Sequence, residues 1–421
     1  MNEIIQNVNF ALLIVFSCCY AYQMVYLIVG LVKKDRPETL PAQPHRFAVL
    51  IPARNEEMVI SGLIDSIHRQ DYPTELIDIY VIADNCTDST AARAIECGAK
   101  VIARFNNRQV GKGYALDYAL KHIDHQVGLE YYDAFLVFDA DNVLDTGYFT
   151  AMNKTFSQGY DILTSYRNSK NYGTNWITAG YALWFLRESR FLNGARMKLG
   201  TSCAISGTGF LVATKVFRED NGWKFNLLTE DIQFSTAHII RGDKIGYCKD
   251  AVLYDEQPVT FKASWNQRLR WTKGFYQVFA RYGKDLVKGI VLRHSFQCYD
   301  MLMVIAPATL LTLASLLFNG GCLLAGLASG TLAVAECAAS GLGGCLLSVY
   351  FSLLAFGIVT LITEQKQIHC SKPRQILYLL MFPVFIFTYI PMAVVALRKN
   401  VTWKHIPHSI LCTADQICEK K

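Results

Sequence analysis

The chain has 421 residues, of which 52% are hydrophobic, and a formal net charge of +6. Such a modest charge gives no reason to expect a nucleic-acid partner, and this hydrophobic content is unusually high for a wholly soluble protein. The length allows one large domain or two of ordinary size. We therefore expect a membrane protein with a sizeable soluble part, whose partners include the lipid bilayer but no nucleic acid.

Four stretches with almost no charged residues account for the hydrophobic bias. Each exceeds the roughly 20 residues that a helix needs to cross a bilayer. They lie at residues 9–32, 302–335, 337–363 and 375–397. Basic residues Lys33, Lys34 and Arg36 follow the first stretch, and the positive-inside rule places them in the cytosol. The sequence thus predicts a multi-pass plasma-membrane protein, with an N-terminal span over 1–34 and a membrane region over 299–397.

Residues 35–298 are predicted to form a cytosolic domain in which strands alternate with helices. The expected strands lie at 47–51, 77–84, 100–105 and within 133–142, and Pro52 is expected to end the first. This alternation is typical of a parallel, doubly wound α/β sheet. Ligands of such sheets bind at the carboxyl ends of the strands. Three of these ends carry polar clusters, "PARNEE", "ADNCTD" and "DADN", which together indicate a functional site.

The remaining segments leave two questions of topology open. The basic, aromatic segment at about 262–282 is predicted to be an interfacial helix. The glycine-rich break in "LLFNGGCLLAGLASG" suggests either one span plus a long apolar loop or two short spans within 302–335. A straight last crossing would put the tail, 398–421, outside the cell. The positive-inside rule favours a cytosolic tail, which requires a re-entrant or interfacial hairpin before it, and we expect the cytosolic arrangement.

Acidic side chains at the strand ends indicate the chemistry. Asp139 and Asp141 leave a buried strand one residue apart, so their oxygens can surround one Mg²⁺ or Mn²⁺ ion. An ion held there could stabilise the charge on a departing diphosphate. Further along the chain come "IADNCTD", "LLTED" and "QRLRW". In the last of these, arginine suits phosphate and tryptophan offers a flat face for a sugar ring.

In this order, and beside membrane spans, these motifs resemble those of the family-2 glycosyltransferases, specifically the processive membrane synthases of cellulose, chitin, hyaluronan and poly-N-acetylglucosamine. The resemblance extends from "IPARNEE" to "QRLRWTKG". It implies a GT-A-type fold and an inverting transfer from a nucleotide-diphosphate sugar, usually a UDP-sugar. The acceptor would be the growing polysaccharide.

The resemblance also implies roles for individual residues. Asp231 would be the general base, with Glu230 beside it, and Asp141 and Asp139 would hold the metal ion. The residues implied in binding the nucleotide sugar are Pro52, Arg54, Glu56, Asp84, Lys112, Asp139, Gln267 and Arg270, and those implied in binding the acceptor are Ser206, Gly207 and Trp271. The tail "TWKHIPHS" resembles a Trp-containing segment that closes over the nucleotide in some synthases.

The small cytosolic part is similar to that of small Gram-positive synthases. We expect a processive enzyme that polymerises UDP-glucose into a β-glucan, with mixed linkages included, and translocates it. The alternatives are a poly-N-acetylglucosamine synthase that uses UDP-N-acetylglucosamine and a non-processive enzyme that adds one sugar to a lipid. A non-enzymatic scaffold or transporter is disfavoured because all the expected acids are present.

Overall fold

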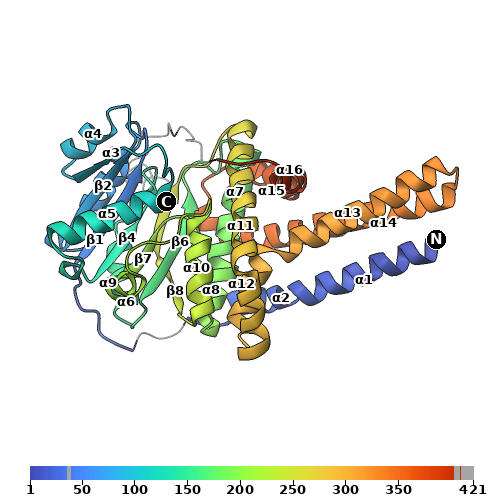
Figure 1. Ribbon diagram of the computed structural model, residues 1–421, viewed down its shortest axis with the longest axis horizontal. Coiled ribbons are helices and arrows are strands. Elements are labelled where there is room, and N and C mark those ends of the chain that lie inside the picture. The colour runs from blue at the N-terminus through green and yellow to red at the C-terminus, as the bar shows by residue number, and fades with distance from the viewer. Residues whose placement is uncertain (36–38, 403–407, 409–421) are drawn as a thin grey trace.

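The computed structural model describes residues 1–35, 39–402 and 408. An eight-stranded sheet with helices on both faces forms the centre of the molecule (Figure 1). The strands, in chain order, are β1 (Phe47–Ala53), β2 (Ile77–Asp84), β3 (Lys100–Arg104), β4 (Ala134–Val137), β5 (Val143–Leu144), β6 (Ile162–Ser169), β7 (Phe210–Ala213) and β8 (Ile245–Asp255). Their order across the sheet is β3-β2-β1-β4-β7-β6-β8-β5. The predicted doubly wound α/β sheet is confirmed.

The sheet is parallel in its first half and mixed in its second. Strands β3, β2, β1 and β4 run parallel, as the alternation of strands and helices predicted. Strand β7 is antiparallel to both β4 and β6, while β8 runs parallel to β6 and antiparallel to the short β5. The parallel half therefore brings the ends of β1, β2 and β4 to one edge.

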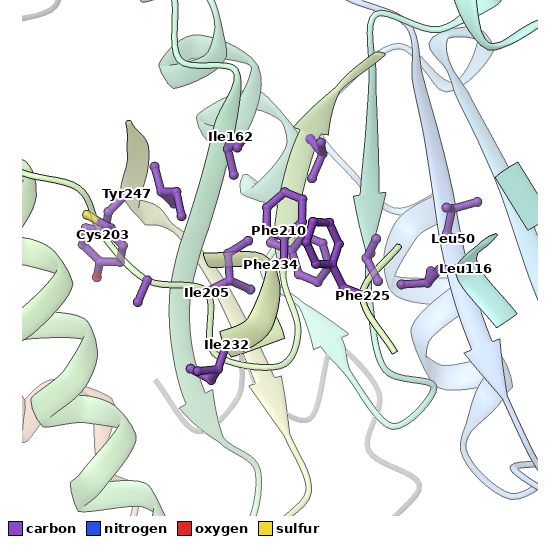
Figure 2. Close-up of a cluster of buried hydrophobic side chains, with 14 of the residues drawn as sticks. Leu50, Leu116, Ile162, Cys203, Ile205, Phe210, Phe225, Ile232, Phe234 and Tyr247 are labelled. Atoms are coloured by element: carbon purple, nitrogen blue, oxygen red, sulfur yellow. The ribbon is translucent and has the colours of Figure 1, made fainter. Parts of the chain in front are cut away.

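Each face of the sheet is covered because alternate residues of its strands point to opposite sides. Helices α3 (Ile60–His68), α4 (Thr90–Glu96) and α6 (Tyr148–Phe156) cover one face, and α5 (Lys112–Gln126), α9 (Thr214–Asp220) and α10 (Glu230–Arg241) cover the other. Val49 packs in the first layer and Leu50 in the second. Figure 2 shows Leu50 near Leu116 of α5. Because both layers are apolar, the strands show the continuous hydrophobic runs seen in the sequence.

Strand β1 continues through Pro52, so the prediction that this proline ends the strand is wrong. Pro52 pairs in register with Ile82 of β2, whereas pairing with β4 stops at Leu50. Beyond Leu50, β1 therefore has a neighbour on one side only. This is the edge-like setting in which a residue without an N–H group is tolerated.

A second set of helices lies between the sheet and the membrane region. It comprises α7 (Trp176–Arg187), a π-helical segment (Glu188–Asn193), α8 (Gly194–Leu199), α11 (Phe261–Arg293) and α12 (Phe296–Ile305). Helix α11 begins where the interfacial helix was expected but extends about three turns further. In Figure 1 it lies at the boundary between the sheet and the apolar helices. Three short 3₁₀ segments, Thr74–Leu76, Leu129–Tyr131 and Gln365–Gln367, complete the helices.

Four helical segments among the described residues are long and apolar enough to cross a membrane. They are Asn2–Val32, Leu310–Ala328, Leu332–Thr363 and Lys372–Arg398. They belong to α1 (Asn2–Tyr20) with α2 (Tyr22–Val32), α13 (Pro307–Ala328), α14 (Leu332–Thr363), and α15 (Lys372–Phe387) with α16 (Tyr389–Arg398). In Figure 1, α1, α13 and α14 project from the sheet as an arm, whereas α15 and α16 lie against α7 and α11.

Helix α13 passes without interruption through the glycine-rich "LLFNGG". The chain breaks only at the end of the glycine-rich stretch, at residues 329–331 between α13 and α14, so α13 is one continuous helix and not two short spans. Glycine is common in membrane helices because the backbone hydrogen bonds of a helix in lipid have no water to compete with them.

A buried ion pair joins α8 to α12 near the base of the arm. The Arg196 guanidinium donates to both carboxylate oxygens of Asp300, at 2.7 and 2.8 Å. The hydroxyls of Tyr22 and Tyr26 donate to the same carboxylate at 3.0 and 2.6 Å. Both charged side chains are only 3% exposed. This network connects α2 of the N-terminal apolar segment to α8 and α12.

We expect Asp300→Ala to lower the free energy of unfolding by about 3–5 kcal/mol, because it leaves the Arg196 charge buried without its partner. The measurement is the thermal unfolding midpoint of the full chain in detergent. Asp285→Ala is the matched control, since Asp285 is half exposed and pairs with Lys288 at the surface. Equal midpoints for the two variants would contradict the structural role of the pair.

Candidate active site

Asp139 and Asp141 follow β4 but lie in different surroundings. The Asp139 carboxylate is 41% exposed and accepts a hydrogen bond from Lys112 Nζ at 2.5 Å. Asp141 is buried, and its Oδ2 accepts from the backbone N–H of Glu256 at 3.0 Å. One carboxylate of the predicted pair therefore faces the open site, and the other lies beneath it.

A histidine from the C-terminal tail lies between two carboxylates of the site. His408 Nδ1 is 3.0 and 3.1 Å from the two oxygens of Glu56, and its Nε2 is 4.0 Å from Asp141 Oδ2. Burial opposes protonation of this imidazole, but Asp141 and Glu56 outweigh it and raise the pKa of His408 to about 10. The space between Glu56 and Asp141 is thus occupied by a positive group at neutral pH.

The residues here fit a divalent cation whose coordination shell is completed by phosphate oxygens of a substrate. No three His, Cys, Asp or Glu side chains of the described residues form a metal-binding group by themselves. Mg²⁺ commonly takes only one or two carboxylates and fills its other positions with water and substrate phosphates. The carboxylate of Asp141 already lies 4.0 Å from the cationic His408 imidazole. The arrangement therefore suits an ion that binds together with a nucleotide diphosphate.

The predicted nucleoside pocket lies at the ends of β1 and β2. Arg104 donates to Asp84 Oδ1 at 2.6 Å, and both side chains are less than a tenth exposed. Burial raises the pKa of Asp84, and Arg104 and Arg54 oppose that rise. Pro52 is paired within β1 beside this edge. Asp84 is therefore held in place by Arg104, so its position at the strand end is fixed before any ligand binds.

One loop links the donor side of the site to the predicted base. Gly207 donates its N–H to Asp231 Oδ2 at 2.7 Å, and its carbonyl accepts from Lys112 Nζ at 2.7 Å. Gly207 has a φ of +81°, a conformation that glycine adopts without strain. Lys112 also holds Asp139. Lys112, Asp139, Gly207 and Asp231 are thus brought together, as the motifs predicted.

Burial shifts the acids at the start of α10. Burial first, and then the charge of Asp231, raise the pKa of Glu230 to about 7. Burial likewise raises the pKa of Asp231, and the hydrogen bond from Gly207 and the charges of Lys112 and Arg270 moderate that rise. A base whose pKa lies closer to neutrality is a better proton acceptor for a sugar hydroxyl.

Helix α11 brings the "QRLRW" motif to the same place. Gly274 makes the close approach possible, since a Cβ there would lie 2.5 Å from the Thr229 side chain. Arg270 donates to the carbonyl of Leu228 at 3.1 Å. Gln267 Oε1 is buried and has no hydrogen-bond partner among the described residues. A buried amide oxygen without a partner is costly unless a ligand satisfies it.

Trp271 belongs to an aromatic group rather than to the charged loop. Its ring contacts Tyr181 and Phe185 edge to face, with centroid distances of 5.7 and 6.3 Å. Tyr181 in turn lies 5.0 Å from Phe385 of α15. The aromatic side chains therefore continue from the predicted acceptor position towards the apolar helices.

Four residues of the site were not predicted individually: Arg167, Glu188, Glu256 and His408. The resemblance of "TWKHIPHS" to a segment that closes over the nucleotide implied that the tail could cover the site, but the contact of His408 with Glu56 and Asp141 depends on folding. The other tail residues of that motif from Trp403 to Pro407, and Ser409, lie outside the described residues. The only sequence signal for His408 was a histidine in a tail that could return to the cytosolic domain.

Comparison with known proteins identifies the family. Residues 44–274, just over half of the chain, match the family model described as glycosyltransferase like family 2. The chain belongs to the family-2 glycosyltransferases. All the site residues predicted from the sequence fall inside the matched region, whereas His408 lies outside it. The predictions of the family, the enzyme class and the glycosyltransferase domain's α/β fold are confirmed.

This glycosyltransferase is similar in sequence to two curated proteins and in structure to one solved protein. The β-monoglucosyldiacylglycerol synthase of Synechocystis sp. is 26% identical over 240 residues, 56% of this chain and 48% of the relative. The poly-β-1,6-N-acetyl-D-glucosamine synthase of Staphylococcus epidermidis is 24% identical over 280 residues, 62% of this chain and 64% of the relative. The chain thus aligns with about half to two thirds of these relatives' length.

The solved structure supports the GT-A-type fold over the whole length. The mannosyltransferase PcManGT from Pyrobaculum calidifontis, in complex with GDP-Man and Mn²⁺, superposes with a TM-score of 0.53 and 16% identity. The superposition covers 94% of this glycosyltransferase and 99% of PcManGT. At this identity the likeness concerns the fold, including the arrangement of the sheet.

Proposed function

We propose that this glycosyltransferase is a processive, inverting synthase. It would take glucose from UDP-glucose, extend a β-linked glucan, with mixed linkages included, and pass the product across the plasma membrane. The observation that carries the proposal is the partly exposed indole face of Trp271 on α11, whose ring packs against the buried side chains of Tyr181 and Phe185. Sugar rings stack on such faces without being fixed in one register, as a polymer that advances one residue at a time requires.

Acid–base chemistry would be performed by the chain's own side chains. Asp231 would take the proton of the acceptor hydroxyl during attack, which typically contributes 10²–10⁴-fold to a rate. Lys112 and Arg270 would face the diphosphate, since both already lie among the acids of the site. A divalent ion held by Asp141 and Asp139 would supply positive charge to the leaving diphosphate. Attack opposite that group inverts the anomeric carbon, so an α-linked donor gives a β-linkage.

A membrane orientation follows from the same proposal. Catalysis would take place in the cytosol, where UDP-sugars are made, and His408 would bring the C-terminal tail back to that side. Helices α15 and α16, which only Thr388 separates, lie against α7 and α11, and they would run along the membrane interface rather than straight across it. The partly exposed Trp271 on α11 would then lie near the point at which the product enters the membrane.

Two alternative products come from the relatives. Similarity to a β-monoglucosyldiacylglycerol synthase favours a single transfer of glucose to a lipid. Similarity to a poly-β-1,6-N-acetyl-D-glucosamine synthase favours polymerisation of N-acetylglucosamine. Both would use the same base and the same nucleotide pocket, so they differ from our proposal in the donor sugar or in the acceptor.

A donor screen tests the proposal. The full-length protein in lipid nanodiscs is incubated with radiolabelled UDP-glucose or UDP-N-acetylglucosamine, with Mg²⁺ or Mn²⁺, and the product is separated by size and subjected to linkage analysis. We expect a high-mass, β-glucanase-sensitive product from UDP-glucose. A single labelled glycolipid would show that the protein transfers one sugar to a lipid and is not a polymerase. A polymer formed from UDP-N-acetylglucosamine alone would show that this sugar nucleotide, and not UDP-glucose, is the donor.

A further inference from the structure

A small polar cavity of about 10 Å³, room for one water molecule or one sugar hydroxyl, lies beside the loop that holds the predicted base. Its lining includes Arg167, Phe185, Glu188, Ser206 and Thr208. Phe185 also contacts Trp271 edge to face, so the cavity adjoins the predicted acceptor position. None of the established or proposed steps uses the carboxylate in this cavity, that of Glu188.

Glu188 is placed by an irregular helical segment. Helix α7 ends at Arg187, and the chain continues as a π-helical segment from Glu188 to Asn193. Such segments are rare, and they occur often at functional sites because they re-aim side chains that a regular helix would point elsewhere. Ser206 Oγ donates to Glu188 Oε2 at 3.2 Å. The segment thus directs an acidic side chain at the loop that also holds the base.

The arginine in the cavity is committed to a different carboxylate. Arg167 Nε donates to Asp255 Oδ2 at 2.6 Å, and its Nη1 donates to the carbonyl of Ser206 at 2.9 Å. Its guanidinium also stacks on the Phe185 ring, 3.7 Å from the centroid. Arg167 therefore contacts both the loop at Ser206 and the ring of Phe185. The Glu188 carboxylate can accept about four hydrogen bonds, so it can accept further ones besides that from Ser206.

Consecutive residues of one loop hold the two acids. Ser206 binds Glu188 through its hydroxyl, and Gly207 binds Asp231 through its backbone N–H. Burial raises the pKa of Glu188, and the neighbouring charge of Asp231 adds to that rise while Arg167 opposes it. A sugar carries hydroxyls on adjacent carbons, so one hydroxyl can meet Asp231 while a second meets Glu188.

We propose that Glu188 is an acceptor-specificity residue, whose carboxylate accepts a hydrogen bond from an acceptor sugar hydroxyl adjacent to the one that reacts. This inference rests on the proposed transfer to a sugar acceptor. Through this second contact, Glu188 favours a carbohydrate over water as the nucleophile and determines which hydroxyl faces Asp231. It therefore contributes to the linkage of the product, although it takes no proton itself.

The test measures how UDP-glucose is divided between transfer and hydrolysis. Full-length wild type, Glu188→Gln and Glu188→Asp are compared in nanodiscs with a glucose oligosaccharide as acceptor. Glutamine can still accept the hydrogen bond but lacks the charge that strengthens it, so Glu188→Gln should reduce the transfer-to-hydrolysis ratio about tenfold, chiefly through a higher KM for the oligosaccharide. Glu188→Asp keeps the charge and should show a smaller reduction. Glu219→Gln, an exposed carboxylate on α9, is the matched control.

Each outcome supports or overturns the inference. A reduced ratio, with UDP affinity retained and altered linkages in the product, supports it. An unchanged ratio with unchanged linkages overturns it, and so does an equal loss of transfer and hydrolysis, which would place Glu188 in the chemical step. Should Glu188→Gln fail to bind UDP, the same criteria apply to Glu188→Asp. A wild type that makes no polymer refutes the proposed function, whereas only the ratios of the variants refute the role of Glu188.

Discussion

Asp231→Asn should reduce the rate of sugar transfer by about 10²–10⁴-fold, the usual contribution of a general base, and leave UDP affinity unchanged. Asparagine has the shape of aspartate, and its amide oxygen can still accept the hydrogen bond from Gly207. Only the ability to take a proton is lost. Initial rates with radiolabelled donor, together with UDP titration of the same preparations, give the measurement.

Asp161→Asn is the control for this variant, because Asp161 is partly exposed and pairs with Lys215 away from the site.

The rate of sugar transfer by the wild type should also increase with pH. The pKa of Asp231 is raised by burial, and the base works only when ionised. The rate of the wild type should therefore rise with pH through a limb above the ordinary range of an aspartate. Wild-type rates in Asp231→Asn would assign the base to another residue.

The parallel half of the fold could be predicted because its hydrophobic pattern is local. Strands buried on both faces are continuous apolar runs, and β1, β2 and β4 were found from those runs. Strands β5, β6 and β8 were not, since their pairing depends on residues far away in the chain. Pro52 shows the same limit, because whether a proline ends a strand depends on the neighbours that remain beside it.

The site divides in a similar way. Residues that follow a strand or begin a helix, such as Asp139 and Asp231, could be predicted because an element's end fixes where they lie. Glu188 could not, because a regular continuation of α7 would have aimed it differently. His408 could not either, since it approaches Glu56 from more than 350 residues away along the chain. A site residue can therefore be predicted from the sequence only where a regular strand or helix determines its position.

Metal dependence is the second large effect we expect. Asp141→Asn should weaken the metal-dependent part of UDP binding by at least about tenfold, the lower end of what even outer-shell changes cost at metal sites. Although burial favours the neutral form, His408 and Lys170 lower the pKa of Asp141, so the site holds a full negative charge that asparagine cannot supply. The measurement is UDP affinity with Mn²⁺ and with a chelator, by titration calorimetry.

The comparison with Asp161→Asn distinguishes a lost ligand from a general change of charge, since both variants remove one carboxylate. Asp161→Asn should keep the full difference between Mn²⁺ and chelator, and Asp141→Asn should lose most of it. The affinity for UDP in chelator should be similar in the two proteins, because the nucleoside pocket at Asp84 is formed by a separate ion pair. If Asp141→Asn retained the wild-type response to Mn²⁺, the ion would bind elsewhere, and the burial of Asp141 would need another explanation.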